Sequence, residues 1–270
     1  MIIDSSVAVV TGGSGGIGRA LAQRLVERGA RVLVTDLDPE TVAATVAALM
    51  PAGRGRVVGL AGDCSVETHL QAIVDLAEDR FGPVDLFVAN AGVALGQGLD
   101  AAEEDWQASI EVNVLAHVRA ARVLTPPWLE RGRGYFLSTA SAAGLLTQIG
   151  QPAYSVTKHA AVAFAEWMSV TYGSRGIAVS CLCPMGVNTA MLALAAESED
   201  EAARVSARAV TASGGVLEPL DVADVVMEGL SDERFLILPH PEVAQFYRRK
   251  AADPDRWLTS MQRYRDALPR

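Results

Sequence analysis

Hydrophobic residues in this chain fall into two kinds of segment that follow one another regularly. Short apolar runs rich in valine, isoleucine and leucine show no alternation with polar residues, which is typical of strands buried on both faces of a parallel sheet. Longer segments between them carry apolar residues three and four positions apart, which is typical of helices with one buried face. Strands are predicted at residues 7–10, 31–35, 56–61, 84–89, 134–138, 177–182 and 235–238.

Glycine and proline mark the ends of the predicted helices. The longest uninterrupted helical pattern covers residues 152–172. Another pattern begins at Glu103 and continues to about Leu124. We expect Pro126-Pro127 to end that helix, because proline lacks the backbone N–H that a helix interior uses. Further helices are predicted from about residue 20 to 28, at 40–50, 66–81 and 221–230, and twice after residue 241.

The alternation of strand and helix predicts the fold class. It indicates an α/β fold of the doubly wound, Rossmann type, with a mostly parallel sheet of seven strands and right-handed crossovers. No linker, repeat or low-complexity segment interrupts residues 1–240, so we expect one domain there. Residues 241–270 are expected to form a helical C-terminal extension whose apolar faces pack on this domain or on a neighbouring subunit.

Composition excludes several classes of partner. The formal net charge of -9 argues against binding nucleic acid or an anionic membrane, because both favour basic surfaces. No apolar run approaches the roughly 18 residues that a membrane helix needs, and no basic leader is present. The three cysteines show no C-x-x-C spacing, and the histidines show no paired ligand spacing, so no metal site is predicted. We expect a cytoplasmic protein.

A glycine-rich turn follows the first predicted strand. Its sequence is Thr11-Gly-Gly-Ser-Gly-Gly-Ile-Gly18, and a helical pattern begins directly after it. Glycines let the backbone approach a pyrophosphate, and the first N–H groups of the helix face its charge. We therefore predict a dinucleotide site, with a merely flexible turn as the alternative.

Asp36 ends the second predicted strand, 24 residues after Gly12. An acidic residue at this point can accept hydrogen bonds from the adenosine ribose, and it repels the 2′-phosphate of NADP. Leu37 supplies no cation that would favour that phosphate. The sequence therefore predicts NAD as the cofactor. The alternative is that Asp36 only caps the helix that begins near Pro39.

Tyr154 and Lys158 lie four positions apart in the predicted helix 152–172, and so on one face. A free phenol has a pKa of about 10 and transfers protons poorly at neutral pH, but a nearby cation favours the phenolate. Ser141, 13 residues before Tyr154, ends an apolar run that would bring a hydroxyl to the same place. The alternative is a surface Tyr and Lys on an amphipathic helix.

These motifs occur in an order that resembles the compact short-chain dehydrogenases/reductases. The resemblance covers about residues 5–238 and rests on Thr11-Gly12-x-x-x-Gly16-x-Gly18, Asn90-Ala-Gly92, Asn113, Ser141 and Tyr154-x-x-x-Lys158. It implies that Tyr154 is the general acid/base and that Lys158 lowers its pKa and holds the nicotinamide ribose. It also implies that Ser141 hydrogen-bonds the substrate oxygen, and that Asn113 anchors a water relay.

The resemblance also implies where NAD would bind. Family contacts correspond to Gly12, Ser14, Gly16, Ile17 and Gly18 at the pyrophosphate, Asp36 and Leu37 at the ribose, Asp63 and Cys64 at the adenine, Asn90 beside them, Tyr154 and Lys158 at the nicotinamide ribose, and Pro184, Val187 and Thr189 at the carboxamide. The chain departs from the family at Met185, where glycine is usual, and it lacks the usual glycine-rich ending after the seventh strand.

The predicted substrate is a hydrophobic secondary alcohol or its ketone. Loops 93–99, 142–150 and 185–212 follow strand ends and should wall the ligand crevice. Residues 144–150 contain no cation, and Met191, Leu192 and Leu194 would add apolar surface. Arg204 or Arg208 would argue for an anionic substrate if either entered the site. By local similarity to one family member, Gln151 is a candidate polar contact with substrate, beside Ser141 and Tyr154.

Two other functions stay open at this point. One is an NADH-dependent ketone or enoyl reductase on the same site. The other is a nicotinamide-sensing regulator, since a fold does not dictate a function. The resemblance further implies a homodimer or homotetramer in which the helices of Asn113 and Tyr154 meet their copies.

Overall fold

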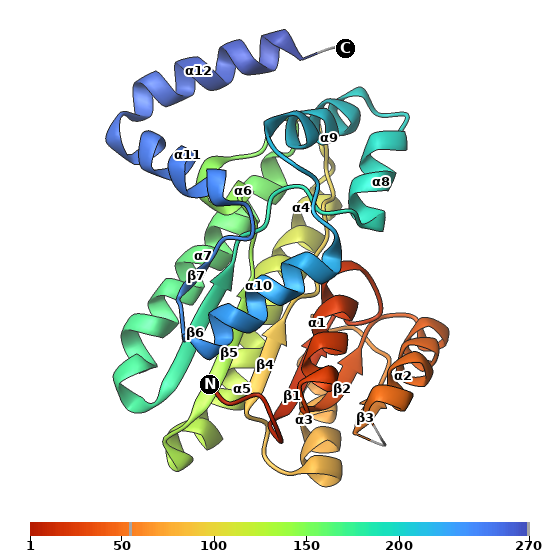
Figure 1. Cartoon of the computed structure of the whole chain (residues 1–270). Coiled ribbons are helices and arrows are strands. Elements are labelled where there is room, and N and C mark those ends of the chain that lie inside the picture. The colour runs from red at the N-terminus through yellow and green to blue at the C-terminus, as the bar shows by residue number, and fades with distance from the viewer. Residues whose placement is uncertain (54–55, 269–270) are drawn as a thin grey trace.

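In the computed structural model, which describes residues 1–53 and 56–268, seven parallel strands form one sheet (Figure 1). Their order is β3-β2-β1-β4-β5-β6-β7, which confirms the predicted fold class. The strand order reverses between β1 and β4, and this places a crevice at the carboxyl ends of the strands. The strands are β1 (Val7–Thr11), β2 (Arg31–Thr35), β3 (Val57–Gly59), β4 (Leu86–Ala89), β5 (Gly134–Thr139), β6 (Ile177–Leu182) and β7 (Leu236–Ile237).

Helices cover both faces of the sheet (Figure 1). One face packs against α3, α5 and α7, with Leu124 and Met168 fully buried, and the other against α1 and α10, with Leu25 and Val226 fully buried. The helices are α1 (Gly16–Glu27), α2 (Pro39–Gly53), α3 (Glu67–Phe81), α4 (Glu103–Ile110), α5 (Ala116–Arg131), α6 (Ala143–Leu146), α7 (Pro152–Tyr172), α8 (Ala190–Glu197), α9 (Glu201–Ser213), α10 (Pro219–Ser231), α11 (Pro241–Ala252) and α12 (Pro254–Ala267).

The expected helix end at Pro126-Pro127 is wrong. Helix α5 continues through both prolines to Arg131, and Gly132 follows with a φ of 67°. Trp128, just after the prolines, is 1% exposed, and its indole N–H donates to the Val84 carbonyl at 2.7 Å. The prolines remove backbone N–H donors from the helix, but burial of this anchored tryptophan outweighs their loss.

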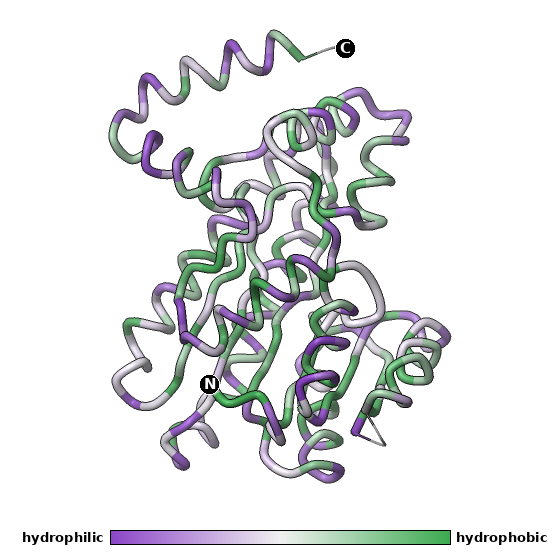
Figure 2. The backbone as a smooth tube through the Cα atoms, viewed as in Figure 1, coloured by the Kyte–Doolittle hydropathy of each residue, from purple (hydrophilic) through white to green (hydrophobic). Residues whose placement is uncertain are grey.

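The C-terminal helices α11 and α12 lie over the end of the molecule that carries α6 and α9 (Figure 1). The Lys250 ammonium donates to the Leu145 carbonyl at 2.7 Å, and the Tyr264 hydroxyl donates to the Ala209 carbonyl at 2.8 Å. Hydrophilic and hydrophobic positions alternate along α12 (Figure 2). Among the described residues, no helix has the length and apolar character that crossing a membrane requires.

Candidate active site

The glycine-rich turn connects β1 to α1 at the crevice. Gly12 and Gly16 have φ angles of 59° and 48°, in the left-handed region that glycine tolerates best. A Cβ on Gly16 would lie 2.9 Å from the Thr189 methyl group, and one on Gly18 would collide with the Gly12 carbonyl. The Ser14 hydroxyl is buried and has no hydrogen-bond partner among the described residues. This close backbone and the unpaired hydroxyl fit a pyrophosphate group.

Asn90 and Thr11 hold that turn in place. The Thr11 hydroxyl oxygen accepts hydrogen bonds from the backbone N–H groups of Asn90 and Ala91, at 2.9 Å and 3.0 Å. The Asn90 side-chain amide donates to the Thr11 carbonyl at 3.0 Å. Asn90 therefore supports the loop from the end of β4.

Asp36 lies beside the turn at the end of β2. Its carboxylate accepts from the Ser14 N–H at 3.0 Å and from the Leu37 N–H at 2.9 Å. The helix-capping alternative is wrong for this residue, because Asp38 instead accepts from the Thr41 N–H at the start of α2, at 3.0 Å. Leu37 is 69% exposed. Asp36 thus borders the space next to the turn.

Asp63 and Cys64 follow β3 along the same edge of the sheet. The exposed Asp63 carboxylate accepts from the Ser65 N–H at 2.8 Å. Burial raises the pKa of the Cys64 thiol to about 12, so this thiol stays protonated at neutral pH. Within residues 1–53 and 56–268, no group of three or more His, Cys, Asp or Glu side chains is arranged to hold a metal ion.

Tyr154 and Lys158 face the same site from α7. The Lys158 nitrogen lies 5.6 Å from the centroid of the Tyr154 ring and donates to the Thr139 carbonyl at 3.0 Å. Lys158 is 3% exposed, and burial lowers its pKa to about 8. Burial also raises the pKa of the Tyr154 phenol, a rise that the Ser141 hydroxyl opposes. In the protein alone the pKa of Tyr154 is therefore raised, whereas the sequence predicted that Lys158 would lower it.

Ser141 lies two residues beyond the end of β5. Its hydroxyl oxygen accepts from the Ala143 N–H at 3.1 Å and lies 3.5 Å from the Pro184 carbonyl. These contacts hold a buried hydroxyl next to the Tyr154 phenol. The structure thus brings Ser141, Tyr154 and Lys158 together.

Asn113 is fully buried in η1 (Glu111–Leu115), a π-helical turn between α4 and α5 that the hydrophobic pattern did not indicate. Its side chain accepts from the Val93 N–H at 2.9 Å, and it donates to the Val93 carbonyl at 2.9 Å and to the Thr157 hydroxyl at 3.1 Å. Both amide hydrogens are therefore used, and Asn113 fixes the loop after β4 against α7.

The segment from Pro184 to Thr189 returns to the glycine-rich turn. Its Thr189 methyl group lies near Gly16, and Val187 pairs with Leu217 in an isolated parallel bridge. Met185 is not among the residues with positive φ, so the side chain that replaces the family's glycine causes no backbone strain. These positions are close to the turn that would hold the pyrophosphate.

His240, which sequence reasoning considered only as a metal ligand, holds this segment. Its Nδ1 accepts from the Met185 N–H at 3.1 Å, and its Nε2 donates to the Gly186 carbonyl at 3.0 Å. This pattern requires a neutral ring with its hydrogen on Nε2. His240 is 2% exposed and follows β7, where the family's glycine-rich ending is missing. No feature of the sequence pointed to this role.

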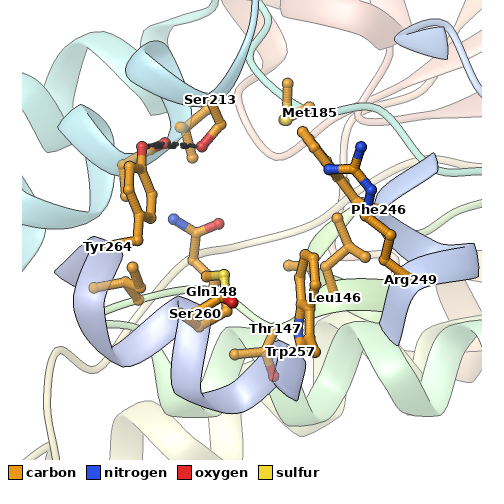
Figure 3. A pocket seen from close by; sticks show the side chains of 16 residues that line it. Leu146, Thr147, Gln148, Met185, Ser213, Phe246, Arg249, Trp257, Ser260 and Tyr264 are labelled. Carbon is orange, nitrogen blue, oxygen red and sulfur yellow. Dashed lines mark hydrogen bonds between the residues drawn. The ribbon is translucent and has the colours of Figure 1, made fainter. Parts of the chain in front are cut away.

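A mostly apolar cavity of about 290 Å³ begins at Ala142 and Ala143, directly after Ser141 (Figure 3). As expected, loops 142–150 and 185–212 contribute to its wall, whereas residues 93–99 do not. The polar side chains from the first loop are Thr147 and Gln148, and the buried Gln151 lies outside the lining. The remaining wall comes from α11 and α12, including Phe246, Trp257, Met261 and Tyr264.

Helix α8 does not add the apolar surface to this cavity that we expected. Met191 and Leu194 are 42% and 71% exposed, and neither they nor Leu192 line it. Arg204 donates instead to the carbonyls of Ser198 and Glu199, and it too lies outside the lining. The tail helices take the place that sequence reasoning gave to α8.

The fold and these motifs have close counterparts among known proteins. A model of the short chain dehydrogenase family matches residues 6–200. A 1-deoxy-11-beta-hydroxypentalenate dehydrogenase of Streptomyces exfoliatus is 32% identical over 251 residues, which cover 90% of this chain and 86% of that protein.

Two solved structures carry different cofactors. A short-chain dehydrogenase/reductase of Burkholderia phymatum in complex with NAD has a TM-score of 0.85 and 31% identity, over 94% of this chain and 96% of that one. An actinorhodin polyketide ketoreductase variant with NADPH has a TM-score of 0.77 and 30% identity, over 87% of this chain and 96% of that one. This chain therefore belongs to the short-chain dehydrogenase/reductase family of oxidoreductases.

Proposed function

We propose that this protein is an NAD-dependent oxidoreductase that transfers a hydride between a hydrophobic secondary alcohol and its ketone. The observation that carries the proposal is the convergence of Ser141, Tyr154 and Lys158, with an apolar cavity that begins at Ala142, the residue after Ser141. When bound, the nicotinamide would accept or supply the hydride. The protein residues would position the substrate and move its proton.

Ser141, Tyr154, Lys158 and Asn113 each have a task in this proposal. The Ser141 hydroxyl hydrogen-bonds the substrate oxygen, and the Tyr154 phenol exchanges a proton with it. Lys158 supplies a fixed positive charge next to the phenol, and its ammonium would contact the nicotinamide ribose. Asn113 keeps the loop after β4 in the position that the site needs.

NAD is the cofactor we infer, from the position of Asp36. Its carboxylate lies against the Ser14 N–H, where the adenosine ribose would sit in this family. A 2′-phosphate would meet this negative charge, whereas two ribose hydroxyls could donate to it. The solved relatives include both an NAD complex and an NADPH complex, so support for NAD comes from Asp36 itself.

A ketone reductase using NADH is the second candidate, and the ketoreductase neighbour favours it. Alcohol oxidation and ketone reduction would use the same residues in the same geometry. The two candidate functions therefore differ in which substrate and which form of the cofactor are supplied. Support for an apolar substrate comes from the wall of the cavity, which includes Leu146, Met185 and Phe246.

We also propose a homo-oligomer that forms through α7. Its outer face exposes an apolar stripe at positions 156, 160, 163, 167 and 170, in which Val156, Trp167 and Val170 are 54%, 53% and 85% exposed. Exposed apolar patches of this kind mark interaction sites. Residues 241–268 are proposed to act as an extension that covers the cavity of their own chain.

Tyr154→Phe tests the chemistry, with Tyr172→Phe on the same helix as its control. With NAD and a panel of secondary alcohols that includes decan-2-ol, the first variant should lose about a thousandfold or more in kcat/KM, because the acid/base group is gone. Its dissociation constant for NAD, measured by calorimetry, should change by less than about twofold, and Tyr172→Phe should match the wild type. Retained turnover in Tyr154→Phe would mean that another group transfers the proton.

A further inference from the structure

The tail helices α11 and α12 form one side of the cavity, which we call its roof, and polar contacts hold them in place. On α12, Trp257, Met261 and Tyr264 follow at helical spacing and line the cavity (Figure 3). The Tyr264 hydroxyl lies 3.0 Å from the Ser213 hydroxyl and donates to the Ala209 carbonyl. The roof is thus anchored at one end to α9.

One cation lies in this apolar wall. Arg249 of α11 lines the cavity on the same side as Met185 and Phe246, opposite Tyr264 (Figure 3). Within the described part of the chain it makes no ion pair and no side-chain hydrogen bond. The neighbouring Lys250 is already engaged, because its ammonium donates to the Leu145 carbonyl.

The acidic groups nearby leave that charge uncompensated. Glu242, seven residues earlier on α11, directs its carboxylate against Gly214. Residues 241–270 contain seven Lys and Arg residues and four Asp and Glu residues. Residues 1–240 contain 16 Lys and Arg residues and 28 Asp and Glu residues. Residues 241–270 are therefore net basic on a protein that is otherwise strongly acidic, and Arg249 is the cation that they contribute to the cavity lining. A cation at this place attracts an anion.

We propose that the cavity selects an apolar substrate that carries one carboxylate, and that Arg249 binds this carboxylate. The apolar body of the substrate would lie among Leu146, Met185 and Trp257, with its alcohol carbon toward Ser141. A guanidinium suits this task because it can donate two parallel hydrogen bonds to a carboxylate. The proposal rests on the proposed function of the adjacent site and adds the substrate class.

Binding of two ten-carbon probes, one with a carboxylate and one with a neutral methyl ketone, tests the proposal. Decanoate and decan-2-one share an apolar chain, and neither turns over with oxidised NAD. Calorimetry on the full-length protein with saturating NAD should show that Arg249→Gln weakens decanoate binding about fivefold or more, as expected for loss of a charge-assisted hydrogen bond at a partly solvated site. Its affinity for decan-2-one should stay within about twofold.

Arg248→Gln is the matched control, because Arg248 is exposed on the same helix but does not line the cavity. It should bind decanoate like the wild type. Arg249→Lys, which keeps the charge, should retain most of the affinity, and salt should weaken decanoate binding to the wild type more than to Arg249→Gln. The proposal would be overturned if Arg248→Gln weakened decanoate binding as much as Arg249→Gln does, or if Arg249→Gln weakened the binding of both probes equally. It would also be overturned if the wild type did not bind decanoate.

These measurements separate the inference from the proposed function. Failure of NAD binding or of alcohol turnover would contradict the oxidoreductase assignment. The role of Arg249 is measured separately, from the affinities for decanoate and decan-2-one, and needs no turnover. The two probe series are therefore repeated without NAD. If decanoate selectivity through Arg249 persists there, the carboxylate site stands even if the cofactor assignment is wrong.

Discussion

Lys158 is a nearly buried cation whose free-energy cost depends on pH. Its pKa is about 8 in the folded protein, below the ordinary lysine value of 10.5. Between these two values the unfolded chain binds more protons than the folded one, so this residue makes stability rise with pH. Below about pH 8 the cost of burying the charge is fully present, and it is relieved as the folded protein loses that proton.

We therefore predict that Lys158→Met changes the pH dependence of unfolding. Urea unfolding at pH 7, 8, 9 and 9.5 should show wild-type stability rising relative to the variant, by about 2 kcal/mol across this range and about 3 kcal/mol if it extended to pH 10.5. The free energy of unfolding of the variant, relative to that of the wild type, should therefore be highest at pH 7. Parallel stability curves for the two proteins would mean that the pKa of Lys158 is close to its ordinary value.

Asp36 determines the cofactor in the proposed function. Asp36→Ala removes the charge that would meet a 2′-phosphate, and the ratio of kcat/KM for NADP to that for NAD should rise at least about tenfold. The exposed Asp38, which caps α2, supplies the control Asp38→Ala. Steady-state kinetics with both cofactors measures the ratio. An unchanged ratio in Asp36→Ala would assign ribose recognition to other residues.

Residues with a chemical signature were predictable, and residues that act through the backbone were not. Spacing predicted Tyr154, Lys158 and Asp36 as site residues because each proposed chemistry needs that side chain at that place. The clamp by His240 depends on a loop 55 residues away and has no local pattern. Likewise, the family resemblance implies that Asn113 anchors a water relay, which stays a prediction, but no feature of the sequence indicated that its two amide hydrogens hold Val93 and Thr157.

Among the elements, strands and most helices follow from hydrophobic periodicity, and local irregularities do not. The seven strands were predicted in order, although β3 and β7 are shorter than expected because pairing with a single neighbour limits these edge strands. The continuation of α5 through two prolines was missed, because the burial of Trp128 decides it. The π-helical turn around Asn113 is equally invisible to a period of 3.6 residues.

At the scale of the whole molecule, a sequence shows which faces are apolar but not what covers them. The apolar residues of α11 and α12 indicated a contact with the same chain or with another subunit. The structure places Phe246 and Trp257 against the cavity of their own chain, yet Leu258 on α12 is 54% exposed. Two faces could therefore meet another subunit: the stripe on α7 and the outer side of α12.

Charged substitutions distinguish these faces. Light scattering after size-exclusion chromatography should give the mass of a dimer or tetramer for the wild type. The double variant Trp167→Glu with Val170→Glu should shift this mass toward the monomer, because two charges would be buried in an apolar contact at a cost of several kcal/mol. Leu258→Glu, an equally exposed apolar position on α12, should leave the mass unchanged. A monomeric wild type, or a mass that responds only to Leu258→Glu, would contradict an interface through α7.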